Sequence, residues 1–263
     1  MTAGAPHDTV DAVILAAGKG TRMKSNLAKV LHRLAGEPLL THVVATIRAA
    51  RVDRTVVVIG HQADRVRATC AGSDLVFVVQ EPQLGTGHAV QVAAPELRDG
   101  GYTVVTAGDV PLLTVATLRR LIDATIADRV AATVLTSVVA DAGAYGRIVK
   151  NDMGGLIRIV EARDATEAEL AIGEYNTGVF CFRTDRLREA LASLTADNDQ
   201  GEYYLTDTVA YLVGRGYPVA TLITDDPAEV VGINTVAELA AAERIYLARH
   251  DGADSTADAG RVD

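Results

Sequence analysis

Three cationic side chains follow a glycine-bearing turn near the N-terminus of this 263-residue chain. Gly18 and Gly20 come after a short apolar run, and glycine lets the backbone pass close to a ligand and turn its N–H groups toward anionic oxygens. Arg22 then offers a planar fork of donors, while Lys24 and Lys29 offer point charges. This combination predicts a polyphosphate-binding loop, although a short glycine motif is equally typical of a plain turn.

Two common phosphate motifs do not fit this loop. A dinucleotide-binding fingerprint needs a third glycine where the chain has Met23. A Walker A motif ends in Gly-Lys followed by Ser or Thr, whereas Lys19 is followed by Gly20. The loop therefore predicts phosphate binding of another kind.

A carboxylate follows a later apolar strand, predicted at residues 104–106. The carboxyl ends of parallel strands form the ligand-binding edge of an open α/β sheet, so Asp109 lies where phosphates would bind. It would repel them unless a divalent cation lay between, and magnesium suits oxygen ligands and phosphates. Alternatively, Asp109 is a simple turn residue. Asn234 can complete the magnesium site or cap the helix that follows it, and the sequence leaves both roles open.

A second glycine-bearing turn, residues 84–89, follows the strand that ends before Gln80. The amide of Gln80 can read a base edge, because it carries both donors and an acceptor. The alternative is a plain turn with Thr86 as helix N-cap. His88 is expected to pack or to hydrogen-bond within the helix rather than to catalyse, since no carboxylate partner is evident.

Apolar runs alternate with amphipathic segments through the first half of the chain, which predicts a doubly wound α/β sheet with right-handed crossovers. Beyond residue 138 a hairpin signal at 148–160 and a strand at 178–182 suggest an antiparallel layer beside the main sheet. An acceptor could rest there, and Gly146, Glu161 and Asn176 are candidates to bind its neutral hydroxyl and amide groups, though each could be a mere loop residue. Strands are expected at 13–15, 55–59, 75–79, 104–106, 132–138, 148–150, 156–160, 178–182 and 219–223, and helices at 38–50, 62–71, 114–127, 185–193, 203–214 and 235–249.

The composition excludes several classes of protein. A net charge of −9 argues against binding nucleic acid, which rests on clustered Lys and Arg. No segment has the apolar length of a membrane span, and the start of the chain lacks the features of a signal peptide. Cys70 and Cys181 are expected to be buried reduced thiols. We therefore expect a cytoplasmic protein with a disordered N-terminus at 1–9, one domain at 10–250 and a disordered acidic tail at 251–263.

Several motifs occur in an order that resembles one family. They are LAAGKGTRM with Lys29-Val30-Leu31-His32, then QLGTGHA, GDVPLL, YGRIV, IVEARDAT, YNTGVF, GEYYLTD and VGINT. The chain resembles the uridylyltransferase domain of bacterial N-acetylglucosamine-1-phosphate uridylyltransferases over nearly all of its expected ordered length. The resemblance implies an α/β, Rossmann-like nucleotidyltransferase fold, with a mostly parallel central sheet flanked by helices and a small antiparallel β layer.

The resemblance also implies roles for individual residues. Catalysis would fall to Arg22 and Lys29, and magnesium to Asp109 and Asn234. The sugar phosphate would be bound by Gly146, Glu161, Asn176 and Asn234. The nucleotide would be bound by Leu15, Ala16, Ala17, Gly18, Lys29, Gln80, Gly85, Thr86, Ala107, Gly108 and Asp109, with Gln80, Gly85 and Thr86 holding the uracil.

The implied reaction joins UTP to N-acetylglucosamine 1-phosphate. An acceptor phosphate oxygen attacks the α-phosphorus of UTP, expelling pyrophosphate and leaving UDP-N-acetylglucosamine. No protein nucleophile is needed. Another base or sugar phosphate, or a catalytically idle nucleotide-binding regulator, are the alternatives, and the presence of the cationic and metal-binding residues argues against the idle regulator.

Two departures from the family pattern stand out. Ala28 replaces a proline that usually precedes the lysine, so the loop that holds Lys29 is expected to be less rigid. Family members also commonly continue into a β-helix of hexapeptide repeats, and nothing after Arg249 resembles one. Acetyltransfer and a trimer formed through that β-helix are therefore not expected of this sequence.

Overall fold

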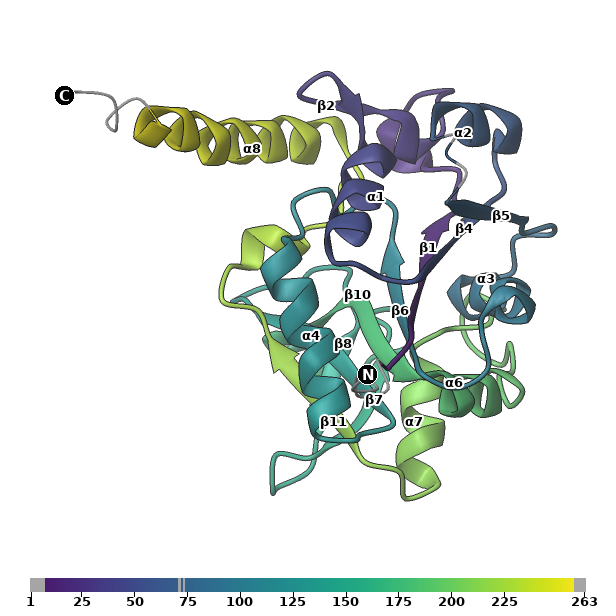
Figure 1. The fold of residues 1–263 in the computed structure, drawn as a ribbon. Helices are drawn as coiled ribbons and strands as arrows, with labels where there is room; N and C mark the ends of the chain where they lie inside the picture. The colour runs from purple at the N-terminus through teal and green to yellow at the C-terminus, as the bar shows by residue number, and fades with distance from the viewer. Residues whose placement is uncertain (1–7, 71, 73, 258–263) are drawn as a thin grey trace, which may run out of the picture.

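The computed structural model describes residues 8–70, 72 and 74–257. One sheet of nine strands runs through the described part of the molecule in the order β11-β7-β10-β6-β1-β4-β5, with β8 paired to β10 and β9 paired to β8 (Figure 1). The strands are β1 (Val10–Ala16), β4 (Arg54–Ile59), β5 (Leu75–Val79), β6 (Tyr102–Ala107), β7 (Ala132–Val138), β8 (Arg147–Lys150), β9 (Leu156–Val160), β10 (Glu174–Arg183) and β11 (Val219–Ile223).

The centre of the sheet is parallel. Strand β1 lies between β4 and β6 and runs parallel to both, and β4 runs parallel to β5. Ile14 contributes to the hydrophobic cluster on one face of the sheet and Val13 to the cluster on the other, because neighbouring side chains of a strand point to opposite faces. The apolar run is therefore buried on both sides, as a parallel strand requires.

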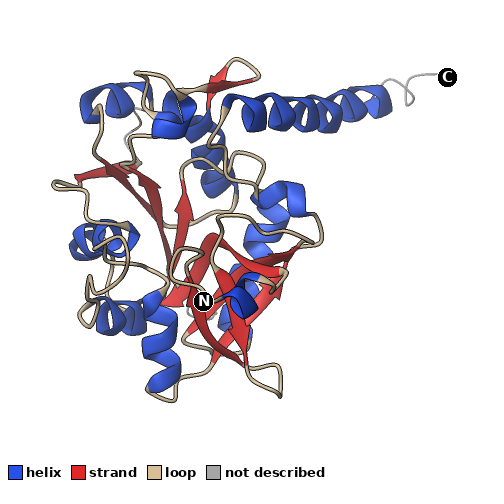
Figure 2. Cartoon of the chain, turned by 180° about the vertical axis from the view of Figure 1, so that it is seen from behind, coloured by secondary structure: helices blue, strands red, loops and turns tan. Residues whose placement is uncertain are grey.

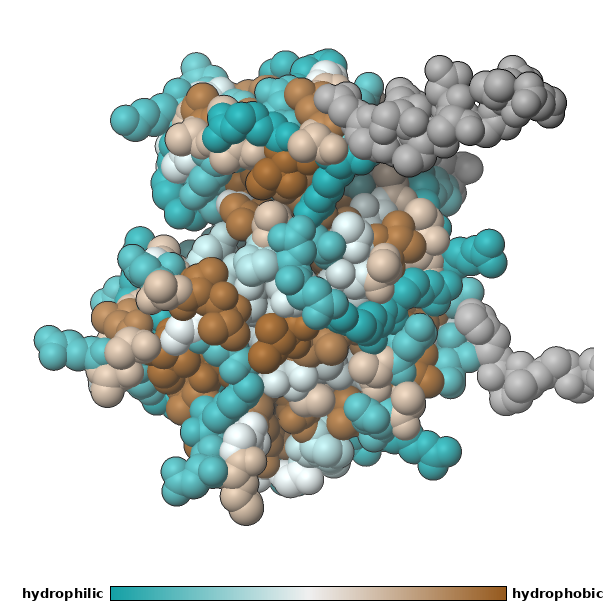
Figure 3. All heavy atoms as spheres, turned by 90° about the vertical axis from the view of Figure 1, so that its left-hand side faces the viewer, coloured by the Kyte–Doolittle hydropathy of each residue, from teal (hydrophilic) through white to brown (hydrophobic). Residues whose placement is uncertain are grey.

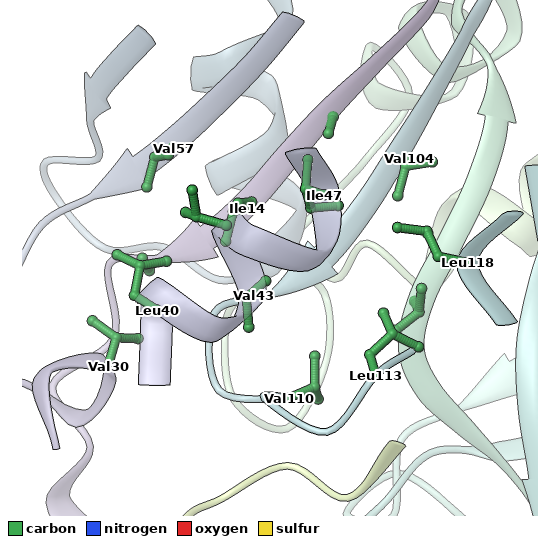
Figure 4. Packing of buried hydrophobic residues seen from close by; sticks show 14 of the residues in the cluster. Ile14, Val30, Leu40, Val43, Ile47, Val57, Val104, Val110, Leu113 and Leu118 are labelled. Atoms are coloured by element: carbon green, nitrogen blue, oxygen red, sulfur yellow. The ribbon is translucent and has the colours of Figure 1, made fainter. Parts of the chain in front are cut away.

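Helices cover both faces (Figure 2). Side chains from α1, α2 and α4 pack on the Ile14 face, where Leu40, Ile47 and Leu118 belong to the same buried cluster as Val104 (Figure 4). Helices α3, α6 and α7 cover the Val13 face. The helices are α1 (Leu39–Ala49), α2 (Ala63–Thr69), α3 (Thr86–Ala93), α4 (Val115–Ala127), α5 (Glu167–Leu170), α6 (Thr184–Leu191), α7 (Asp207–Gly214) and α8 (Val236–Ala257).

The predicted fold class is confirmed, with one difference of detail. Strand β10 does not belong to a separate layer, because it lies inside the main sheet, antiparallel to both β6 and β7. The hairpin of β8 and β9 extends from its first half, where Tyr175 pairs with Arg147. A further antiparallel ribbon, β2 (Arg33–Leu34) with β3 (Glu37–Pro38), was not predicted, because two-residue strands give no periodic signal.

The predicted helix boundaries hold at some ends and fail at others. Thr114 caps α4 through its side chain, as predicted. Helix α8 continues to Ala257 instead of ending near Arg249, so it enters the tail that was expected to be disordered. No proline interrupts this stretch, and one glycine costs a helix only about 1 kcal/mol. Of the expected disordered segments, 1–7 and 258–263 lie outside the described residues, whereas Thr9 accepts a backbone hydrogen bond from Tyr102.

Two properties of the described residues agree with the composition. Cys70 and Cys181 are buried free thiols, as predicted, and burial raises the pKa of Cys181 to about 12. No helix in the described part of the chain combines the length and apolarity needed to cross a bilayer. Exposed apolar side chains are interrupted by hydrophilic ones on the face seen in Figure 3.

Candidate active site

The site begins where β1 and β6 end side by side. Leu15 pairs with Ala107 in the parallel ladder, and the Gly108 N–H donates to the Leu15 carbonyl at 2.9 Å. The loop after β1 and the loop after β6 are therefore tied together at the carboxyl edge of the sheet, the edge at which ligands bind in such folds.

A first cavity of about 490 Å³ opens at this edge, and we call it the nucleotide cavity. A Cβ added to Gly18 would meet no protein atom within 4 Å, so the backbone here leaves open space beside the cavity. Of the predicted nucleotide-binding residues, those that line it are Leu15, Ala16, Ala17, Gly18, Lys29, Gln80, Gly85, Thr86, Ala107 and Asp109.

Gly108 is the predicted nucleotide residue that does not line this cavity. A Cβ at this position would lie 3.2 Å from the Leu15 carbonyl oxygen and 3.2 Å from Val30, so the glycine allows the two strand ends to pack closely. Gly20 has a similar structural task, because its φ is +66° and a Cβ added there would lie 2.5 Å from the Lys29 side chain. Both glycines hold the loops in place.

The loop before Lys29 is anchored in a way that the sequence did not indicate. The Ala28 N–H donates to Gln62 Oε1 at 3.1 Å, and Gln62 Nε2 donates to the Asn26 carbonyl at 2.6 Å. A proline at position 28 has no N–H and would lose the first bond. Alanine at position 28 thus allows a side-chain anchor that proline would not, and the lower rigidity of this loop stays a prediction.

Gln80 lines the nucleotide cavity and is buried. Its Nε2 donates to the Gly85 carbonyl at 2.9 Å and contacts His88 Nδ1 at 3.2 Å. Since an amide nitrogen only donates, the orientation of the amide is fixed, and His88 packs within the protein as expected. Thr86 is the first residue of α3 rather than its N-cap, and its hydroxyl accepts from the Leu205 N–H at 3.0 Å.

A second cavity of about 570 Å³ lies beside the first, and we call it the acceptor cavity. It is bounded by the loop 141–146, by the start of β10 and by the segment 231–234. The four residues predicted to bind the sugar phosphate all line it: Gly146, Glu161, Asn176 and Asn234.

Three of these residues converge on one corner of the acceptor cavity. The Asn176 N–H donates to the Gly146 carbonyl at 2.8 Å. A Cβ on Gly146 would stand 3.4 Å from Glu161 Oε2, so the carboxylate lies directly against this glycine. The Thr206 hydroxyl donates to Glu161 Oε1 at 3.0 Å and orients the carboxylate.

Burial raises the pKa of Glu161 above its ordinary value of 4.5, with Asp207 and Asp164 adding to the rise and the Thr206 hydrogen bond opposing it. A carboxyl with a raised folded-state pKa contributes stability below its unfolded-state pKa, and this contribution is lost as the pH rises through the folded-state pKa. Ionised Glu161 is therefore a cost to folding at neutral pH.

We expect Glu161→Gln to melt at a higher temperature than the wild type above about pH 7, with the difference shrinking toward pH 4, because glutamine does not ionise. Each 1 kcal/mol relieved should raise the midpoint by about 2–4 °C in a chain of this size. Calorimetric melting curves at both pH values test this. Equal differences at the two pH values would contradict it.

The two cavities share Lys29, Ala107 and Asp109 as a common wall. The Lys29 ammonium forms an ion pair with Asp109 and donates to Asn234 Oδ1 at 3.0 Å. Arg22 also donates to Asn234 Oδ1, at 2.8 Å. These four side chains, which are 212 residues apart at the extremes, form one polar cluster at the junction of the cavities.

The structure excludes one of the two roles that the sequence left open for the Asn234 side chain, the N-cap of α8. The Thr235 hydroxyl accepts from the Glu238 N–H at 3.2 Å, and Glu238 Oε2 accepts from the Thr235 N–H at 2.8 Å. This reciprocal pair is a capping box, so Thr235 caps α8. The Asn234 side chain is thereby left to the polar cluster. The Thr-x-x-Glu spacing that would have indicated this was present in the sequence.

Some chemistry-bearing residues lie elsewhere than predicted, or were missed. Lys24 is exposed and lines neither cavity. Tyr145 and Tyr175 line the acceptor cavity with their rings 4.7 Å apart, and Glu202 lines the nucleotide cavity. The tyrosines follow no spacing rule of their own, so only the assembled loop and strand bring them together.

The oxygens of Asp109 and Asn234 both contact one cation, the Lys29 ammonium. Two protein oxygens that converge on a cation suit magnesium, which takes one or two such ligands and completes its shell with water and phosphate. The described residues contain no cluster of three or more His, Cys, Asp or Glu side chains of the kind that would hold a metal without a substrate. The donor set therefore fits a metal that arrives with phosphates.

Residues 12–209 match the model of the MobA-like NTP transferase domain, which covers most of the chain. The chain belongs to this NTP transferase family. Its two cavities at the carboxyl edge of a Rossmann-like sheet are thus the candidate active site of a nucleotidyltransferase domain.

Sequence relatives and solved structures agree with this NTP transferase assignment. The chain is 51% identical over 244 residues to the bifunctional protein GlmU of Acidovorax sp. (strain JS42), and 50% identical over 235 residues to that of Brevibacillus brevis. These matches cover 90% and 89% of the chain but 51% of each relative, so the chain spans about half the length of the curated relatives it matches. A nucleotidyl transferase from Methanothermobacter thermautotroptrophicus shares the fold, with a TM-score of 0.64 at 20% identity over 92% of this chain and 100% of that one.

Proposed function

We propose that the chain transfers uridylyl from UTP to N-acetylglucosamine 1-phosphate, with magnesium, to give UDP-N-acetylglucosamine and pyrophosphate. The observation that carries the proposal is the common wall of the two cavities, Lys29, Ala107 and Asp109. A nucleotide in one cavity and an acceptor in the other would meet there. The motifs that resemble uridylyltransferases supply residues to both cavities.

The chemistry needs no nucleophile from the protein. An oxygen of the acceptor phosphate forms the new bond to the α-phosphorus, while the bond to the β-phosphate oxygen breaks and pyrophosphate leaves. Lys29 lies at the junction and can offset the negative charge that builds around the α-phosphorus. Arg22 lines the acceptor cavity, where its guanidinium can hold the incoming phosphate. Positioning and charge neutralisation supply the acceleration.

Asp109 and Asn234 are the residues that would hold magnesium. When bound, the metal would supply positive charge that offsets the charge of the phosphates. The Asp109 carboxylate also forms an ion pair with Lys29.

Gln80 supports the choice of uracil over cytosine. The donors of its amide are directed to Gly85 and His88, which leaves the carbonyl oxygen to accept a hydrogen bond. Uracil and thymine present an N–H donor at N3, whereas cytosine presents an acceptor there. The hydrogen bond between N3 and the Gln80 oxygen thus distinguishes uracil from cytosine.

The test is pyrophosphate release over a panel of nucleoside triphosphates and sugar 1-phosphates with magnesium. We expect the fastest release with UTP and N-acetylglucosamine 1-phosphate. A faster reaction with another pair would contradict the proposed substrates but not the nucleotidyltransferase activity. No release with any pair would contradict the activity itself.

Glu161→Ala is expected to weaken the binding of sugar 1-phosphate much more than the binding of UTP. The carboxylate lies at the corner of the acceptor cavity with Gly146, where it can accept from sugar hydroxyls. Leaving a sugar hydroxyl without this partner should cost about 1–3 kcal/mol of binding free energy, which raises the Michaelis constant for the sugar 1-phosphate by about 5- to 150-fold. Saturation curves for each substrate, with the other held high, give the two constants. Equal changes in both would remove Glu161 from the acceptor side.

A further inference from the structure

The Tyr145 hydroxyl is linked to Asn234 through the backbone of Gly232. The Gly232 N–H donates to the Tyr145 hydroxyl oxygen at 3.1 Å. The carbonyl of the same glycine accepts from Asn234 Nδ2 at 2.9 Å. Tyr145 comes from the loop before β8 and Gly232 from the segment before α8, so this relay joins two parts of the chain 87 residues apart.

The relay fixes the direction of the Asn234 amide. Because Nδ2 donates to the Gly232 carbonyl, Oδ1 must point the other way, and there it accepts from Lys29 at 3.0 Å and Arg22 at 2.8 Å. If the Gly232–Ile233 peptide, which carries this carbonyl, rotated, Nδ2 would lose its acceptor and the amide could turn. The N–H of that peptide donates to the Asp109 carbonyl at 2.9 Å, and the Tyr145 hydroxyl restrains the Gly232 backbone from its other end by accepting from the Gly232 N–H.

Tyr145 is itself held firmly. Its ring lies 4.7 Å from the Tyr175 ring, and burial raises the pKa of its hydroxyl, so the phenol stays neutral at physiological pH. The backbone of its loop is fixed by the buried Arg147, whose guanidinium donates to the Tyr145 carbonyl and, at 3.0 Å, to the Gly143 carbonyl. The hydroxyl is therefore a fixed acceptor for the Gly232 N–H.

We propose that Tyr145 is a positioning residue that helps to set the Asn234 side-chain oxygen for magnesium, by restraining the backbone of Gly232 through its hydroxyl. The proposal rests on the proposed function. Partners of this kind, which orient a metal ligand without touching the metal, typically change metal affinity or activity by about 10- to 100-fold when removed.

The first test is Tyr145→Phe, which deletes the hydroxyl and keeps the ring on Tyr175. We expect the magnesium concentration that gives half-maximal turnover to rise about tenfold. The Michaelis constant for the sugar 1-phosphate should change less than about twofold. Tyr211→Phe is the control, because it removes a tyrosine hydroxyl that bonds Glu189 and lines neither cavity. It should leave the half-saturating magnesium concentration unchanged.

The second test needs no metal or turnover. The chain has five asparagines, so selective ¹⁵N-asparagine labelling gives few side-chain amide signals, and Asn234→Ala assigns the one of interest. We expect Tyr145→Phe to move the Asn234 signal and Tyr211→Phe to leave it in place. An unmoved Asn234 signal in a folded Tyr145→Phe variant would overturn the relay.

A double-mutant cycle separates positioning from a general structural effect. In the Asn234→Ala background, Tyr145→Phe should raise the half-saturating magnesium concentration by less than about a further twofold, because the Asn234 amide that it orients is already absent. A full additional loss would overturn the proposal. Should wild type fail to release pyrophosphate while the Asn234 signal still moves, the proposed function would fall and the relay would stand.

Discussion

Asp109→Asn is expected to slow pyrophosphate release by at least about a hundredfold while leaving the fold intact. Asparagine has the same shape and still fits the buried position, but it carries no charge to anchor a divalent cation or to pair with Lys29. Initial rates at saturating substrates and magnesium, together with a melting curve, provide the measurement. Turnover close to that of wild type in the folded variant would exclude Asp109 from metal binding.

Asp11→Asn is a matched control for this substitution. Asp11 is also a buried acid of the central sheet, but it lies at the start of β1, where it bonds the guanidinium and the backbone N–H of Arg98. This ion pair lies at the opposite end of the strand from the nucleotide cavity. The control should lower the melting temperature and keep the turnover of the folded fraction.

Lys29→Ala is expected to lower turnover by about a hundredfold or more, with a much smaller effect on thermal stability. The ammonium lines both cavities and pairs with Asp109, so its removal deletes positive charge where the transferred phosphoryl group would lie. Its side chain is 20% exposed and lies outside the hydrophobic clusters, so little packing is lost.

Lys24→Ala serves as the control for Lys29→Ala, because it removes a cation from the same loop at an exposed position that lines neither cavity. We expect less than about a twofold change in its turnover. If Lys29→Ala melts much earlier yet keeps its specific activity, Lys29 is a structural residue and the charge at the junction is not needed.

Local signals predicted much of the fold. The continuous apolar run at Val13–Leu15 correctly indicated a strand buried on both faces, because only a central parallel strand needs apolar side chains in both directions. The Thr114 cap followed from its position before an amphipathic segment. The place of β10 within the main sheet was not predictable, since the antiparallel pairing with β6 and β7 joins segments far apart in the sequence.

The lining of the candidate site was predicted better than the contacts that hold it together. Loop residues such as Gly18 and Asp109 lie at strand ends, and strand ends can be located from the sequence. The close packing of Gly108 against Leu15 was not predicted, because it depends on the register of two strands, and its contact with a nucleotide stays a prediction. Tyr145 was missed because its link to Gly232 exists only once the loop and the segment before α8 have come together.

The separation of the two cavities along the chain has a consequence for how such enzymes can diverge. The nucleotide cavity is built from residues 15–109 together with Glu202, whereas most of the acceptor cavity comes from 139–178 and 231–238. Mutations in the later segments can reshape what the domain accepts without disturbing the parallel core that holds the donor. Substitutions in the antiparallel hairpin and its loops can thus change the acceptor cavity alone, whereas a change at Lys29, Ala107 or Asp109 alters both cavities at once.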